Sequence, residues 1–177
     1  VNTTIYAYAT ASGYNNSSTV SATYTINCVA PTFSPVAGTY SDTQSVTIST
    51  TTSGASIRYT TDGTTPSSSV GTVYSSAVSI STNVTLKAIA YKSGNGDSTV
   101  TSGAYTIQCS TPTVSSTNAN RFVGRKSVTI SSATTGVSIR YTTDGSTPSS
   151  SVGTVYSTAV VVDRPLTLKA IAYRSGC

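Results

Sequence analysis

The sequence predicts an all-β protein made of small β-sandwich domains that repeat along the chain. The first observation is composition, because Met, Trp, His and Glu are absent while Ser, Thr, Val and Tyr are abundant. Strong helix formers are therefore scarce and residues that favour strands are plentiful. The other two observations are a long internal repeat and the alternation of apolar and polar residues within it.

One segment recurs almost letter for letter. Residues Ile57–Pro66 read IRYTTDGTTP, and residues Ile139–Pro148 read IRYTTDGSTP. The offset of 82 residues continues without a gap to Tyr91 and Tyr173. Each copy reads as an alternating strand that enters an Asp-Gly turn and stops at Pro. Because a fixed period identifies repeated domains, we expect tandem copies of one fold, each of about 80 residues.

The repeat predicts three domains. Residues 1–28 match the chain 81 residues further on, so they are expected to be the C-terminal part, the last two strands, of a preceding repeat. Residues 29–109 form the complete repeat, and residues 110–177 form a repeat that lacks its last strand. Pro31 and Pro112 lie near the boundaries, where Pro favours a short, stiff linker.

Seven short strands are expected in the complete repeat. They cover residues 32–35, 44–49, 55–60, 72–75, 77–81, 83–92 and 98–107. In the sixth strand, Leu86 and Ala88 belong to one face, whereas Lys87 and Tyr91 belong to the other. Seven short strands with frequent turn signals indicate an immunoglobulin-like, fibronectin III-like β-sandwich.

Several motifs recur in both copies. They are Gln44-x-Val46-x-Ile48, Ile57–Pro66, Tyr74 and Leu86–Ala90, then Lys126-x-Val128-x-Ile130, Ile139–Pro148, Tyr156 and Leu168–Ala172. Together with a closing Tyr105, this set resembles the C-terminal-type domain of chitobiase and β-hexosaminidase. The resemblance implies a non-catalytic immunoglobulin-like domain, found as an accessory module of secreted bacterial hydrolases and in tandem on large surface proteins. It therefore implies an extracellular or cell-surface location.

Composition argues against several functions. Without His and Glu, neither a Ser-His-Asp triad nor a Glu acid/base pair can form, so we expect no enzyme active site and no cofactor. The ten Lys and Arg residues are scattered and charged residues make up only 8% of the chain, which disfavours nucleic acid. The longest apolar run, Ala159 to Val162, is far shorter than the roughly 20 residues of a membrane span.

Asp62 and Asp144 occupy equivalent positions, directly before Gly63 and Gly145. One hypothesis is a weak calcium site, because Asp with backbone and hydroxyl oxygens suits a hard cation. The alternative is an Asx-type turn, in which the carboxylate accepts backbone N–H bonds while glycine supplies a positive φ. One carboxylate per loop is too few for a tight calcium site, which favours the turn.

A basic and aromatic face is expected on the outer side of one sheet. Arg58 and Lys87 should lie on neighbouring strands and face away from the core, with Tyr91 beside Lys87. The equivalent residues of the next repeat are Arg140, Lys169 and Tyr173. This exposed face could bind polysaccharide or pack on another subunit. The alternative is a solvated face, and the absence of Trp platforms argues against sugar.

The chain has three cysteines, an odd number that in an extracellular protein suggests disulfides and one unpaired thiol. Cys109 precedes the third repeat, and the loop that holds Cys177 should lie at the same end of the sandwich, so these two are the disulfide candidates. Asn95 occupies the position equivalent to Cys177 in the complete repeat. Cys28 is therefore expected to form an intermolecular disulfide or to stay reduced.

The N-terminal residues are candidates for strand donation. Residues 19–26, with Thr19, Val20, Tyr24 and Ile26, match the last strand of the complete repeat, which the third repeat lacks. If the chain ends at Cys177, a neighbour's segment could complete the open sheet and join copies head to tail. Alternatively, the sequence is a segment of a longer chain, which its start in the middle of a strand pattern favours.

Two functions follow as hypotheses. The first is a non-catalytic structural repeat segment of an extracellular bacterial fibre, filament, stalk or adhesin, polymerising head to tail by strand complementation. Its partners would be copies of itself or neighbouring repeats. The second is an accessory carbohydrate-binding module of a secreted polysaccharide hydrolase, which the family resemblance allows.

Overall fold

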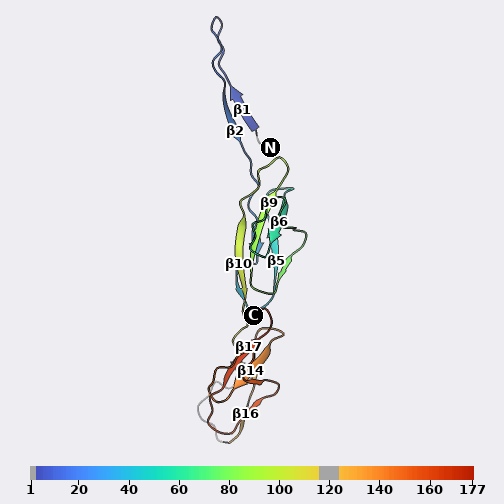
Figure 1. The fold of residues 1–177 in the computed structure, drawn as a ribbon, viewed down its shortest axis with the longest axis vertical. Coiled ribbons are helices and arrows are strands. Elements are labelled where there is room, and N and C mark those ends of the chain that lie inside the picture. Colours follow the sequence, from blue (N-terminus) through green and yellow to red (C-terminus); the bar gives the residue numbers. More distant parts are fainter. Residues whose placement is uncertain (1–2, 116–123) are drawn as a thin grey trace. The chain divides into compact units, whose positions relative to one another are not determined.

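A computed structural model describes residues 3–115 and 124–177. Throughout these residues the regular secondary structure is β-strand (Figure 1), which confirms the all-β fold class. The chain divides into two compact units. The first comprises the residues up to Ala37, Ser45–Val78 and Val84–Ala104, and the second comprises Gly38–Gln44, Ser79–Asn83 and Tyr105–Cys177. Two short segments of the complete repeat thus belong to the same unit as the third repeat.

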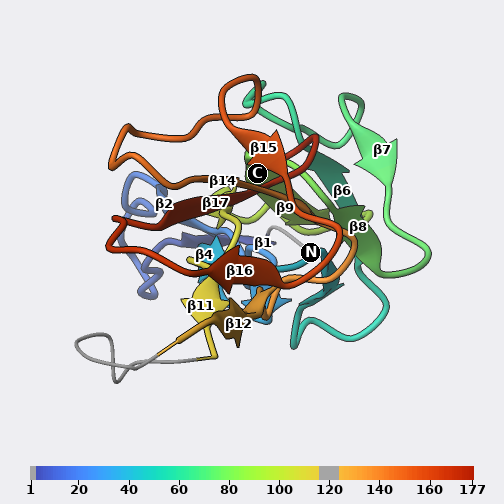
Figure 2. The same ribbon diagram turned by 90° about the horizontal axis from the view of Figure 1, so that it is seen from below.

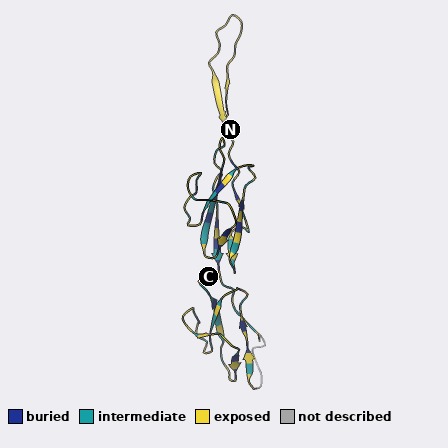
Figure 3. Ribbon diagram, turned by 90° about the vertical axis from the view of Figure 1, so that its right-hand side faces the viewer, coloured by how far each residue is buried: buried dark blue, intermediate teal, exposed yellow. Residues whose placement is uncertain are grey.

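The N-terminal segment is an antiparallel hairpin of β1 (Thr3–Ala7) and β2 (Val20–Tyr24). Its register pairs Thr3 with Tyr24 and Ala7 with Val20. Every residue of both strands is exposed, as the yellow ribbon in Figure 3 shows. The apolar residues that alternate along these strands therefore have no core to face.

The complete repeat holds two sheets. The strands of the first are β3 (Thr32–Ser34), β5 (Gln44–Ser49) and β8 (Val78–Ile80), in the order β3-β5-β8. The strands of the second are β4 (Gly38–Tyr40), β6 (Ser56–Thr60), β7 (Thr72–Val73), β9 (Val84–Tyr91) and β10 (Thr101–Ile107), in the order β4-β10-β9-β6-β7. Two sheets joined in this way fit the predicted sandwich.

Two details of this repeat differ from the sequence expectation. Strand β4 was not predicted, because a three-residue segment with Gly shows no alternation; it forms by parallel pairing with β10, where Gly38 lies opposite Tyr105. The last strand begins at Thr101 and not at residue 98. Ser98 still contacts Ala90: its N–H donates to the carbonyl of Ala90, and its buried hydroxyl accepts the N–H of Ala90, both at 2.9 Å.

The core of the complete repeat follows the predicted alternation. On β9, Leu86, Ala88 and Ala90 are fully buried, and on β5 the same is true of Val46. Ile89, on the opposite face of β9, is buried as well at 6% exposure. Pro66, in the loop after β6, is also fully buried, and Arg58 of the same sheet donates to the carbonyls of Ser68 and Gly71 in that loop. The outer face of this sheet is thus covered by the chain itself.

The third repeat has a related arrangement. Its strands are β11 (Thr113–Val114), β12 (Lys126–Val128), β13 (Ile130–Ser131), β14 (Ser138–Thr142), β15 (Thr154–Val155), β16 (Val160–Val162) and β17 (Lys169–Tyr173). Of these, β14, β15 and β16 are as long as their equivalents β6, β7 and β8. The pairs β11-β13 and β12-β16 form two small sheets, and β15-β14-β17 form a third. Strands β14 and β17 lie side by side in both views (Figures 1 and 2), with Ser138 opposite Tyr173.

Among the described residues, no helix is long and apolar enough to cross a membrane.

Candidate functional site

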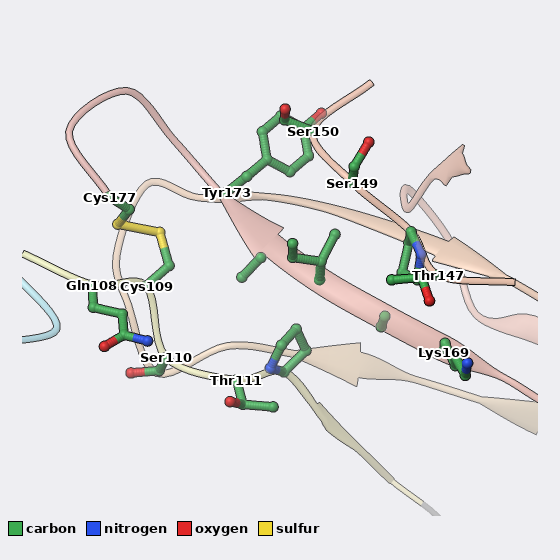
Figure 4. Close-up of a pocket in the computed structure, with 15 residues that line it drawn as sticks. Gln108, Cys109, Ser110, Thr111, Thr147, Ser149, Ser150, Lys169, Tyr173 and Cys177 are labelled. Carbon is green, nitrogen blue, oxygen red and sulfur yellow. A yellow bond between two sulfur atoms is a disulfide. The ribbon is translucent and has the colours of Figure 1, made fainter. Parts of the chain in front are cut away.

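A groove of about 760 Å³ runs along one edge of β17 (Figure 4). Its walls come from the residues that enter the third repeat, from the loop after β14 and from β17 itself. The lining residues are Gln108, Cys109, Ser110, Thr111, Pro112, Thr147, Pro148, Ser149, Ser150, Lys169, Ala170, Ile171, Ala172, Tyr173 and Cys177. The Cys109–Cys177 disulfide lies at one end and Lys169 at the other, as Figure 4 shows.

The groove lies where the complete repeat has a strand. At an offset of 82, β17 corresponds to β9, which has β6 on one side and β10 on the other. In the described chain, β17 has β14 as its one sheet neighbour. As a result Leu168 and Ala170 are half-buried, although their equivalents Leu86 and Ala88 are fully buried. The groove is therefore shaped by an unpaired strand edge with apolar walls.

The disulfide between Cys109 and Cys177 closes one end of the groove, with Cα atoms 5.3 Å apart. Next to it, the N–H of Ser110 donates to the hydroxyl of Thr134 at 2.8 Å, and Thr134 is buried. The start of the third repeat is thus joined by a hydrogen bond to the loop after β13 and by the disulfide to the turn after β17.

Cys28 occupies the position equivalent to Cys109, directly before the complete repeat, and carries a free thiol. Its N–H donates to the carbonyl of Gly96 at 2.9 Å, next to Asn95, so it meets the same turn that Cys177 occupies in the third repeat. The side chain is 5% exposed. An intermolecular disulfide at Cys28 would require an accessible sulfur, which this burial does not provide.

A charged contact that sequence reasoning missed braces the second unit. The guanidinium of Arg174 donates to Asp42 at 3.0 Å, and Thr135 donates its hydroxyl to the same carboxylate at 3.0 Å. Hydrogen bonding, led by the backbone N–H of Thr135, lowers the pKa of Asp42. The sequence signal was the replacement of Lys92 by Arg174 at equivalent positions, since Arg can contact two acceptors at once.

The residues predicted for a basic and aromatic face lie on neighbouring strands, but five of the six are half-buried and the arginines donate to the protein's own backbone. Arg58 donates to the carbonyl of Ser68 at 3.0 Å and to that of Gly71 at 2.6 Å. Its guanidinium carbon lies 5.9 Å from the centre of the Tyr91 ring. Arg140 repeats all three contacts with Ser150, Gly153 and Tyr173 at the same distances. Both arginines therefore fasten the loop that covers their sheet.

The two lysines of this face differ. Lys87 is half-buried and its ammonium donates to the carbonyl of Gly63 at 2.6 Å. Lys169 is exposed and lines the groove. Of the six residues predicted for the basic and aromatic face, Lys169 and Tyr173 line the groove, together with the disulfide candidates Cys109 and Cys177.

Asp62 and Asp144 lie in Asx-type turns. The N–H and the hydroxyl of Thr64 both donate to one oxygen of Asp62, at 3.0 and 2.7 Å. Ser146 makes the same pair of bonds to Asp144. These hydrogen bonds, with the side-chain hydroxyl first, lower the pKa of both carboxyls. Within residues 3–115 and 124–177, no group of three or more His, Cys, Asp or Glu side chains is placed to hold a metal ion.

The proposed strand-donor residues lie on the exposed hairpin or directly after it. Tyr24 and Ile26 are 58% and 60% exposed, and Val20 is 67% exposed. Their equivalents at an offset of 81 include Tyr105 and Ile107, which are each 1% exposed. Thr19, just before β2, is also exposed. The same sequence pattern is thus buried in one setting and open to solvent in the other.

The sheets and their covering loops define an all-β protein of the immunoglobulin-like class. Residues 35–102 match the family model of the chitobiase/β-hexosaminidase C-terminal domain, and residues 128–177 match that of the Fn3-associated family. These matches confirm the family resemblance inferred from the sequence. No curated protein matches the chain significantly. The boundaries at residues 28 and 109 stay a prediction.

Proposed function

We propose that the chain is a non-catalytic structural segment of an extracellular bacterial fibre, filament, stalk or adhesin. Its repeats would provide rigid modules, and further copies would join head to tail by strand complementation. The chain's partners would then be copies of itself or neighbouring repeats.

The observation that carries this proposal is the use of polar side chains for bracing. The guanidinium groups of Arg58 and Arg140 and the ammonium of Lys87 are directed at backbone carbonyls. Asp62 and Asp144 accept bonds from their own turns. In a binding module, charged groups of this kind would contact a small ligand. In this chain they hold loops against sheets. Such repeated bracing suits a load-bearing array in which each repeat has its own core.

An extracellular location is supported by two findings. The Cys109–Cys177 disulfide suits an oxidising environment, because thiols are kept reduced in the cytosol of most cells. Residues 35–102 match the chitobiase/β-hexosaminidase C-terminal domain family, which the resemblance seen in the sequence links to secreted proteins. Localisation of the native protein by immunogold labelling of intact cells tests this part, and cytoplasmic label would contradict it.

The family match also favours a second candidate, an accessory module that binds polysaccharide. Its contact residues would be Tyr91 and Tyr173 with the neighbouring cations. A glycan array with the full chain distinguishes the candidates. The structural proposal predicts no binding above background. Binding that is lost in Tyr91→Ala and Tyr173→Ala, but kept in the exposed-tyrosine control Tyr14→Ala, would instead support the carbohydrate module.

A further inference from the structure

We propose that Asn95 is a site of self-modification, at which the side-chain amide is lost to attack by the next backbone nitrogen, and that residues Ile26–Cys28 control this reaction. The pair Asn95-Gly96 is the single Asn-Gly dipeptide of the chain. Asn is a thermolabile residue, and a following Gly has no side chain to hinder ring closure. The pair lies in the turn after β9, where the N–H of Asn95 donates to the carbonyl of Lys92 at 3.1 Å.

The reaction needs water as its one co-reactant. The nitrogen of Gly96 loses its proton and attacks the side-chain carbonyl carbon of Asn95, and ammonia leaves as a cyclic imide forms. Water then opens the ring at one of its two carbonyls, which gives either Asp or isoaspartate. Neither step transfers electrons to or from an outside group. Asn95 is half-buried, so its side chain is in contact with solvent.

The attacking nitrogen is held by the segment Ile26–Cys28. The N–H of Gly96 donates to the carbonyl of Ile26 at 3.0 Å, and the carbonyl of Gly96 accepts the N–H of Cys28 at 2.9 Å. Asn27 lies opposite Gly96 in a parallel bridge, and all these residues belong to the first compact unit. Because the nitrogen must lose its proton and turn toward Asn95, these bonds have to open before it attacks. The segment Ile26–Cys28 therefore acts as a gate.

The same close packing explains why glycine occupies position 96. A Cβ atom there would collide with the side-chain oxygen of Asn27. Glycine is therefore required by the approach of Asn27, and the reactive dipeptide arises because Asn precedes it. In the equivalent turn of the third repeat, Cys177 replaces Asn95 and forms the disulfide with Cys109. The two turns thus carry different chemistry at one position of the fold.

The modification should in turn release Cys28. Isoaspartate adds a methylene group to the backbone directly before Gly96, and either product adds a negative charge close to Asp97. The altered backbone displaces the carbonyl of Gly96, to which the N–H of Cys28 donates. The thiol of Cys28, which is 5% exposed in the unmodified chain, should then become accessible.

Thr52→Val in the full chain tests the gate. The hydroxyl of Thr52 accepts the N–H of Val29, directly after the gate, at 2.8 Å. Thr134→Val is the matched control, because Thr134 accepts the N–H of Ser110 at the same distance in the third repeat. Peptide mapping by mass spectrometry follows amide loss at Asn95 over days in mildly alkaline buffer. We expect a rate several-fold higher in Thr52→Val than in the wild type and in Thr134→Val. Equal rates in the two variants would overturn the gate.

Unfolding and thiol labelling provide the second test. In urea, Asn95 of the wild type should be modified at least about tenfold faster than in the folded chain, because the reaction proceeds from the open state. Equal rates would contradict the proposal. In the folded chain, labelling of Cys28 should rise with the modified fraction. Asn95→Gln, whose longer side chain closes this kind of ring much more slowly, should show no such rise. An equal rise in Asn95→Gln would refute the release of Cys28.

Discussion

The guanidinium of Arg174 lies 3.0 Å from the carboxylate of Asp42, 132 residues earlier in the chain. Arg174 also donates to the carbonyl of Thr135 at 2.9 Å. Lys92, its equivalent, makes the corresponding backbone contact with Ser53 at 2.7 Å. The third repeat thus keeps a contact shared by both copies and adds an ion pair to a loop of the complete repeat.

The lowered pKa of Asp42 predicts an acid-sensitive contribution to stability. Because the folded-state pKa lies below the ordinary value of 3.8, this contribution is present above that value and is lost as the pH falls through the folded-state pKa. Asp42→Asn should lower the urea midpoint of unfolding at neutral pH. Near pH 2, the difference in midpoint between the variant and the wild type should become smaller. Asp62 and Asp144 titrate in both proteins, so the difference isolates Asp42. A difference in urea midpoint that does not change with pH would contradict this prediction.

Cys28 should form a disulfide when a partner is supplied at the matching turn. Asn95→Cys puts a thiol at the position equivalent to Cys177, beside the Gly96 carbonyl that Cys28 already contacts. We expect the variant to show no titratable thiol in denaturant, whereas the wild type shows one. The stabilisation should be about 2–4 kcal/mol. Ser93→Cys, in the same turn, is the matched control, and an equal yield of disulfide there would count against the equivalence of the two turns.

Equivalent tyrosines should differ sharply in their contribution to stability. Tyr105→Ala removes a side chain that is 1% exposed and stacks on Tyr40 at 6.2 Å between ring centres. It should cost about 3–5 kcal/mol of unfolding free energy. Tyr24→Ala, at an exposed position, should change it by less than about 0.5 kcal/mol in dilute solution. Urea titrations followed by circular dichroism measure both values. Similar losses of unfolding free energy in the two variants would contradict the exposed position of Tyr24.

Arg58 should stabilise the fold through geometry and not through charge alone. Arg58→Ala removes two hydrogen bonds to loop carbonyls and should cost about 2 kcal/mol. Arg58→Lys keeps the charge but cannot reach both acceptors from one planar group, so it should recover less than half of the loss. Thermal denaturation of both variants tests this. Full recovery by Lys would mean that the two-acceptor contact is not what stabilises the loop.

The fold could be predicted from the sequence because its signals are local and occur twice. Alternation along residues 84–91 placed Leu86 and Ala88 in the core, as the structure shows. Strand β4 was not predicted because it depends on parallel pairing with a segment more than 60 residues away. A three-residue strand is too short to show an alternation that would indicate this pairing. Burial of Ile89 was not predicted either, because alternation along β9 assigns that residue to the outer face of the sheet.

The candidate site was less predictable. Arg58 and Lys87 were recognised as neighbours on one face, but their acceptors are backbone carbonyls, which no residue pattern identifies. Asp42 gave no signal of its own, because its partner lies in another repeat. The exposed state of Tyr24 and Ile26 follows from what surrounds them, and the sequence alone shows only their likeness to Tyr105 and Ile107.

Electron microscopy of the native material tests the central claim most directly. If the chain is a structural segment of an extracellular fibre, the preparation should contain ordered filaments with a regular axial repeat, and antibodies against the exposed hairpin loop at residues 11–18 should decorate them at that spacing. A preparation of monodisperse particles without filaments, under conditions in which the protein is intact and oxidised, would contradict the claim.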